Sequence, residues 1–186
     1  EAATASTMLL LMRMSIRSIA HPERLIDALT LVLIIALSAI PYVGRLNFTS
    51  DGWGIIGHFQ AAERAGRSII AATLPNFGVR PVQGLYLAML YEGFGLDPIG
   101  YHLVNTTVIA ASVVLLYLLL LRLRFSRTEA FASALIFALL PQLSTVRVWY
   151  AAFQIPLSML FMLVSMHAQL SARRSSPIRP SSRSAR

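Results

Sequence analysis

Cysteine and lysine are both absent from this chain of 186 residues, whereas arginine occurs 16 times. Without cysteine, disulfide bonds, thiolate nucleophiles and thiolate metal ligands are all excluded. Arginine in place of lysine is typical of GC-rich coding and favours a bacterial source. Charge is scarce as well: 13% of the residues are charged, against roughly 25% in soluble globular domains. Because 56% of the residues are apolar, the composition indicates a membrane protein.

Long apolar runs without charge are the second indication of a membrane protein. A helix needs about 20 mostly apolar residues to cross the hydrocarbon core of a bilayer. Four segments meet or approach this length, so we expect an all-α polytopic membrane protein with a transmembrane domain over residues 25–172. The expected spans cover residues 25–44, 102–121, 129–146 and 150–170.

The distribution of arginine predicts the orientation of these spans. With the amino terminus in the cytoplasm, eleven of the 16 arginines lie inside and five lie outside, as the positive-inside rule requires. We therefore expect a multi-pass protein of the bacterial inner membrane, with the lipid bilayer as a partner. The chain carries a net charge of +8, but its sequence contains no basic patch interleaved with aromatic side chains. Nucleic acid is therefore not an expected partner.

The two ends of the chain differ from the expected spans. Residues 1–24 place several arginines on one helical face, which predicts an amphipathic helix in the cytoplasmic interface. A signal peptide is the alternative, but the apolar run over residues 8–12 is short for one. Residues 173–186 are mostly Ser, Arg and Pro, a composition that predicts disorder. A truncated or frameshifted gene would produce such a tail.

Residues 45–101 form a connection far longer than the usual 4 to 6 residues, and long loops are commonly functional. Apolar residues recur at helical spacing over residues 51–74 and again over residues 80–94. We therefore expect two amphipathic juxtamembrane helices on the outer face, separated by the break "PNFGV". Asp97 followed by Pro98 predicts the N-cap and first residue of the second span.

Asp51 is the leading candidate for chemistry, because it lies just after the first expected span. A hydroxyl nucleophile needs a carboxylate base within hydrogen-bond reach, and a lipid-borne substrate must react near the bilayer surface. The alternative is that Asp51 caps the helix that follows. Both interpretations stay open, and they are compatible with each other.

Three further residues are candidates for substrate binding, each with an ordinary structural alternative. Arg80 can fork onto phosphate oxygens, or it can anchor at the interface and pair with a glutamate. His102 lies one helical turn from Asn105, where an interhelical hydrogen bond is the common explanation. Arg147 precedes Trp149 and Tyr150, which are typical of an aromatic belt. The four histidines show no metal-ligand spacing, so the sequence does not require a metal ion. A divalent cation as cofactor is nevertheless compatible with the sequence.

Several spaced motifs over residues 25–170 resemble C-type membrane glycosyltransferases, in particular the bacterial proteins related to protein O-mannosyltransferases. The pattern in that family is F-R-P-L, then Y-x-x-F-G-x-x-P, then Y-H-L-V-N. This chain matches it with "RP" at residues 80–81, with Phe94, Gly95 and Pro98, and with "YHLVN" at residues 101–105. It departs from the family where Gly52 follows Asp51 in place of a second acid. Near the end of the third expected span, Leu140 and Thr145 stand at the family's His and Glu positions.

The resemblance implies inverting transfer of a sugar from a polyprenyl-phosphate donor to a protein or glycan acceptor outside the cytoplasm. Asp51 would be the base, and Arg80, His102 and Arg147 would bind substrate. Catalytic units of this family have many more than four spans, so we expect the chain to be the amino-terminal part of such an enzyme. A non-catalytic scaffold or transporter subunit is the alternative. A transporter is disfavoured because none of the four apolar runs contains a charge near the expected mid-membrane level.

Overall fold

The computed structural model describes residues 21–41, 47–48, 51–140, 146, 149 and 152–175, and this part of the chain is all α-helical. Most of the expected interfacial segment 1–24, most of the tail 173–186 and Arg147 lie outside the described residues. The helices are α2 (Pro22–Ala39), α3 (Asp51–Arg64), α4 (Ile69–Asn76), α5 (Pro81–Phe94), α6 (Pro98–Arg122), α7 (Arg127–Leu139) and α9 (Gln154–Ser175).

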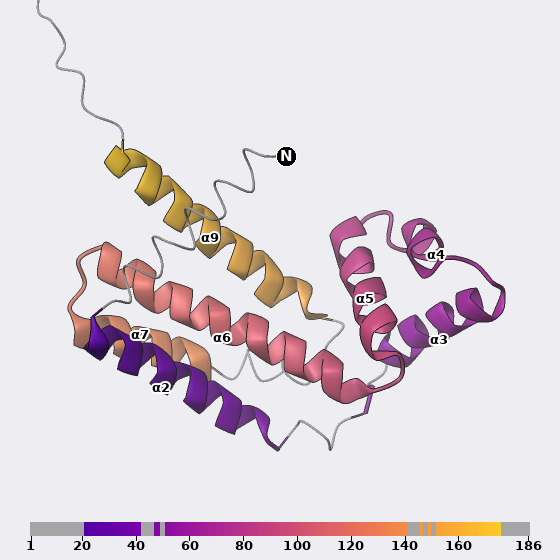
Figure 1. Ribbon diagram of the computed structural model, residues 1–186, viewed down its shortest axis with the longest axis horizontal. Helices are drawn as coiled ribbons and strands as arrows, with labels where there is room; N and C mark the ends of the chain where they lie inside the picture. The colour runs from indigo at the N-terminus through magenta and orange to yellow at the C-terminus, as the bar shows by residue number, and fades with distance from the viewer. Residues whose placement is uncertain are drawn as a thin grey trace, which may run out of the picture.

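Helix α6 is the centre of a helix bundle formed with α2, α7 and α9 (Figure 1). Asp97 opens it as predicted: its carboxylate accepts a hydrogen bond of 3.0 Å from the backbone N–H of Ile99, and Pro98 is the first helical residue. Alanines recur every fourth residue on the buried face of α7, so that α7 can approach α6 closely. The core of the bundle contains Leu31, Ile35, Ile109, Val113, Leu118, Ala130, Ala134 and Ala138.

Two helices in the described residues are long and apolar enough to cross a membrane. These are α6, with a mean hydropathy of 2.3, and the Gln154–Arg173 part of α9, with a mean hydropathy of 1.4. Helix α2 begins with three charged residues, Glu23, Arg24 and Asp27. Helix α7 has 13 residues and is therefore about 20 Å long. Of the four expected spans, the described residues therefore support the second and the fourth.

Helices α3, α4 and α5 form a separate group at the end of the bundle where α6 begins (Figure 1), which we call the cap. The expectation of one helix over residues 51–74 is wrong, because two helices cover this segment. Gly66 adopts a φ of +64° and ends α3, with Gly66 N–H bonded to Glu63 O and Arg67 N–H to Ala62 O, the pattern of a Schellman motif. Ser68 then caps α4.

The cap has its own core of large side chains, drawn mainly from α3 and α5. Phe59 and Tyr91 pack with ring centroids 5.3 Å apart, and the Tyr91 hydroxyl donates a hydrogen bond of 2.7 Å to Glu63. Burial, together with the charge of Glu63, raises the pKa of Tyr91 to about 12. Glu63 is therefore a partner of Tyr91 within the cap.

Helices α4 and α5 approach each other closely at Gly84. A Cβ atom added at Gly84 would lie 2.5 Å from Thr73 Cγ2 and 2.6 Å from Phe77 Cβ. Such distances are well inside van der Waals contact, so glycine is required for this separation of the two helices.

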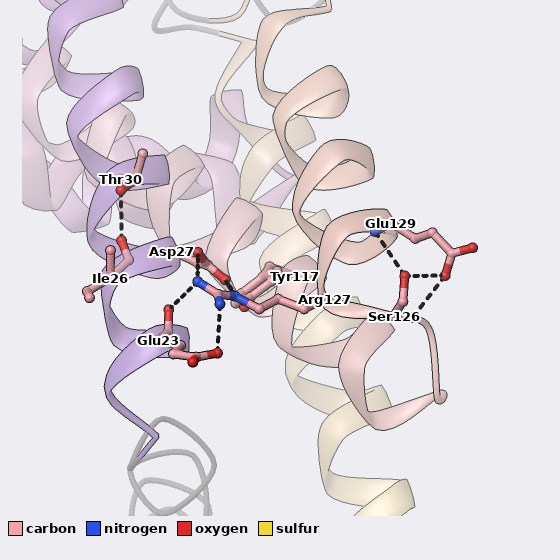
Figure 2. Close-up of polar contacts among 8 residues, drawn as sticks. All are labelled: Glu23, Ile26, Asp27, Thr30, Tyr117, Ser126, Arg127 and Glu129. Carbon is pink, nitrogen blue, oxygen red and sulfur yellow. Dashed lines mark hydrogen bonds and ion pairs between the residues drawn. The ribbon is translucent and has the colours of Figure 1, made fainter.

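The opposite end of the bundle is joined by charged and hydroxyl side chains from three helices (Figure 2). The Asp27 carboxylate of α2 accepts hydrogen bonds of 2.6 Å from Tyr117 of α6 and of 2.6 Å from Arg127 Nε of α7. Arg127 Nη1 also donates to Glu23 at 2.7 Å. We call Glu23, Asp27, Tyr117 and Arg127 the Asp27–Arg127 cluster.

Candidate functional site

The candidate site lies where the cap meets the first turns of α6 and α9 (Figure 1). Aromatic rings fill this junction. Phe48 packs edge-on against Trp53 at 5.3 Å and against Tyr101 at 5.1 Å between ring centroids. The Tyr101 hydroxyl donates a hydrogen bond of 2.9 Å to the carbonyl of Gly95. These contacts hold the start of α3 and the end of α5 against the first turns of α6.

Asp51 is the first residue of α3 and is exposed to solvent. Phe48 and Trp53, which flank Asp51 in the sequence, pack edge-on against each other with ring centroids 5.3 Å apart. A carboxylate in the first turn of a helix is stabilised by the helix dipole and by free backbone N–H groups. The position therefore suits a helix-terminal role and leaves the carboxylate accessible to solvent, so both interpretations of Asp51 stay open.

Arg80 precedes the first turn of α5 and lines a cavity of about 410 Å³ between α5 and α9. The side chain of Arg80 is exposed at the edge of this cavity. Two amide side chains, one from each helix, share the cavity with it, whereas the remaining wall is mainly aromatic and aliphatic. The lining residues are Arg80, Pro81, Val82, Gln83, Phe153, Gln154, Leu157, Ser158 and Phe161.

Tyr86 packs behind this cavity, one turn further along α5 from Gln83. Its ring stacks on Phe153 with centroids 3.6 Å apart and planes 7° from parallel. Burial raises the pKa of Tyr86 to about 12. The Tyr86 hydroxyl and Gln154 Oε1 are buried and have no hydrogen-bond partner among the described residues. Buried polar atoms are normally partnered, so these atoms mark a place suited to a polar ligand group.

His102 is almost completely buried in the first turns of α6, with 2% of its surface exposed. Neither ring nitrogen of His102 has a hydrogen-bond partner among the described residues. Asn105, one turn later, donates a hydrogen bond of 2.8 Å from Nδ2 to the carbonyl of Val146. Asn105 therefore makes a polar contact with a residue outside its own helix.

The structure places Asp51, Arg80 and His102 at one end of the molecule, but in different surroundings. Arg80 lines the cavity, whereas Asp51 and His102 are not among its lining residues. Arg147 lies outside the described residues. The residues that the sequence analysis missed are Gln83, Tyr86 and Gln154. The available signal was a glutamine within each of the apolar stretches "RPVQGLYL" and "AAFQIPL".

Metal binding finds no structural support in the described part of the chain, where no three His, Asp or Glu side chains are grouped to hold a cation. Comparison with protein-family models, with curated proteins and with solved structures finds no match to this chain.

Proposed function

We propose that the chain is a multi-pass membrane glycosyltransferase, or the amino-terminal part of one. It would transfer a sugar from a polyprenyl-phosphate donor to a protein or glycan acceptor on the outer face of the bacterial inner membrane, with its amino terminus in the cytoplasm. Two apolar helices of spanning length support the membrane location. The family motifs around Arg80, Gly95 and His102 support the chemistry.

The cavity beside Arg80 is the observation that carries this proposal. A polyprenyl phosphate combines an anionic head with a long hydrocarbon chain. Arg80 offers a guanidinium for the phosphate, Gln83 and Gln154 offer amides for hydroxyl groups, and Phe153, Leu157 and Phe161 offer apolar wall. The cationic part of the cavity therefore suits the phosphate of the proposed donor, and the apolar part suits its hydrocarbon chain.

The additional spans of the proposal would be α2 and α7 with the residues that follow each. Helix α2 supports this assignment through a row of exposed apolar side chains that water would not favour. These side chains are Ile26, Leu29, Leu33, Leu37 and Ile40. The cap helices α3–α5 would then lie at the outer surface, near the level where the spans leave the hydrocarbon.

In the proposed reaction, Asp51 accepts the proton of the acceptor hydroxyl while that oxygen attacks the anomeric carbon of the sugar. The bond between this carbon and the phosphate oxygen breaks, and the polyprenyl phosphate leaves with the bonding electrons. Arg80 offsets the charge that develops on the phosphate. Attack opposite to the leaving group inverts the anomeric configuration.

Donor binding is the first test, and it needs no turnover. We expect detergent-solubilised protein to bind radiolabelled polyprenyl phosphate in a filter assay. Arg80→Gln should weaken binding about tenfold, since a charge-assisted hydrogen bond is worth about 1.5 kcal/mol or more. Arg67→Gln removes the same charge from the cap away from the cavity and should leave binding unchanged. Equal affinities for all three proteins would remove Arg80 from the donor site and favour a non-catalytic scaffold.

Sugar transfer is the second test and concerns Asp51 alone. In membranes that show transfer from a polyprenyl-phosphate sugar, Asp51→Asn should lower the rate by about 100-fold or more, as expected for loss of a general base. Donor binding should be kept in the same variant. Glu92→Gln, an exposed acid on α5, is the control. Unchanged turnover in Asp51→Asn would exclude Asp51 as the base.

A further inference from the structure

A second cavity, of about 650 Å³, lies at the end of the bundle opposite the cap, where α2 begins and α6 ends. It differs from the Arg80 cavity in its charge, since three arginines and one histidine line it together with a single acid. Two apolar side chains from the end of α6 and the turn after it complete the wall. The lining residues are His21, Pro22, Glu23, Arg24, Leu121, Arg124, Phe125 and Arg127.

The one acid of this cavity has its charge offset. Glu23 accepts a hydrogen bond of 2.7 Å from Arg127, which also binds Asp27 (Figure 2). Arg127 is therefore balanced by two carboxylates of α2, and the three arginines that line the cavity outnumber its single acid. Its net charge suits an anion.

Arg124 occupies an unusual backbone position beside this cavity. Its φ is +74°, and it is the one residue other than glycine with a positive φ in the described part of the chain. The backbone bonds from Arg124 N–H to Leu121 O and from Phe125 N–H to Leu120 O form a Schellman motif at the end of α6. The equivalent position at the end of α3 holds Gly66, the residue that such a position favours. Arginine at this position therefore needs a reason other than backbone conformation.

Helix termination and packing between helices do not supply that reason. Arg122, in the last turn of α6, already places a cation at the negative end of the helix dipole. It also donates hydrogen bonds of 3.3 Å to the carbonyl of His167 and of 3.2 Å to Ser171, joining α6 to α9. Arg124 is exposed and lines the cavity instead.

We infer that this cavity binds the phosphate headgroup of an anionic phospholipid, with Arg124 as the cationic ligand. Helix α6 is long and apolar enough to cross a bilayer, so the turn at Arg124 would lie at the depth of lipid headgroups. Leu121 and Phe125 would contact the first carbons of the acyl chains, as is usual for basic pockets at the ends of membrane helices. The inference depends on α6 lying in a membrane and is independent of sugar transfer.

The test compares lipid binding by two variants with the same substitution and the same loss of charge. Arg124→Asn keeps a residue that tolerates positive φ, and Arg67→Asn is the control in the cap. Native mass spectrometry of the detergent-solubilised full chain gives the affinity for phosphatidylglycerol, for phosphatidylcholine and for inorganic phosphate. We expect preference for phosphatidylglycerol, and a loss of about five-fold in Arg124→Asn alone, which corresponds to about 1 kcal/mol for one arginine near an anionic surface.

Thermal unfolding of a third variant separates binding from folding. Arg124→Gly should keep or raise the melting temperature without lipid, because glycine favours the backbone conformation, and should show the same loss of phosphatidylglycerol affinity. Equal affinity for phosphatidylglycerol and phosphatidylcholine would overturn the inference, as would equal losses in Arg124→Asn and Arg67→Asn. Binding of inorganic phosphate as tight as that of phosphatidylglycerol would also overturn it, because it would identify a site for free phosphate.

Discussion

The two ends of the helix bundle differ in whether their buried polar side chains have hydrogen-bond partners. At the end near Arg127, the Asp27 carboxylate is hydrogen-bonded to side chains of two other helices at 2.6 Å each. At the cap end, the Tyr86 hydroxyl and both ring nitrogens of His102 are buried and have no hydrogen-bond partner among the described residues. Partnered networks stabilise a fold, whereas buried polar atoms without partners destabilise it unless a ligand binds them. The comparison therefore indicates that the Asp27–Arg127 cluster stabilises the bundle, whereas the buried polar atoms of the cap end are compatible with the polar ligand of the proposed donor site.

The core of the bundle and the core of the cap differ in the kinds of side chain that form them. Among the described residues, Tyr117 is the one aromatic residue in the buried core of the bundle, which otherwise consists of aliphatic residues and alanines that pack the helices closely. The cap core is rich in aromatic rings, including Phe48, Phe59, Tyr91, Tyr101 and Phe153. Aromatic side chains combine a large apolar surface with specific contact geometry, so they can form the wall of a binding site as well as a core.

Removing the carboxylate of Asp27 is expected to have the largest effect on stability. Asp27→Ala leaves the Tyr117 hydroxyl without its acceptor, and a hydrogen bond to a charged group contributes about 1.5 to 3 kcal/mol. We expect the free energy of unfolding to fall by about 2 kcal/mol or more. Unfolding would be measured in mixed detergent micelles and monitored by circular dichroism. Glu23→Ala removes an acid that is 69% exposed in its side chain and should change little. Equal losses in the two variants would contradict a stabilising role specific to Asp27.

The close approach of α4 and α5 gives the next largest effect, in the cap. Gly84→Ala should lower the free energy of unfolding by about 1 to 3 kcal/mol, because the new methyl group would overlap Thr73 and Phe77. Gly57→Ala, within α3, is the matched control, since an added Cβ there meets nothing within 4 Å. It should stabilise the helix by about 0.5 to 1 kcal/mol. The same unfolding assay measures both variants. Destabilisation by Gly57→Ala would contradict the open space that the structure shows around Gly57.

Two tyrosines test the comparison directly, with the smallest expected changes. Tyr117→Phe removes the hydroxyl that binds Asp27 and should lower the free energy of unfolding by about 1.5 kcal/mol. Tyr86→Phe removes a buried hydroxyl without a partner among the described residues and should leave stability unchanged or slightly raised. Both are measured by unfolding without ligand. If Tyr86→Phe were the more damaging of the two, the contrast between the ends of the bundle would be broken.

Local features of the fold could be predicted from the sequence. Asp97 and Pro98 identify the start of α6 because capping depends on neighbouring residues. The Schellman turn at Gly66 was open to the same reasoning but was missed, since the apolar periodicity continues on both sides of it. The length of α6 follows from its apolar composition. Because glycine at a helix end is a local signal, the division of residues 51–74 into two helices was predictable from the sequence.

Contacts between distant residues could not be predicted in this way. Asp27 and Arg127 are 100 residues apart, and the sequence does not indicate which of the arginines Asp27 binds. The cavity beside Arg80 likewise depends on how α9 packs near α5, which brings Gln154 to Gln83. Arg80 and His102 were found from motif spacing alone, and their surroundings came from tertiary packing.

The separation of Asp27 from Arg127 also has a consequence for biosynthesis. During translation, Asp27 leaves the ribosome 100 residues before its guanidinium partner. At about 5 to 20 residues per second, this delay is about 5 to 20 seconds. Throughout that interval the carboxylate would keep the start of α2 at a hydrated surface, and α2 would become fixed in place only after α7 has been synthesised.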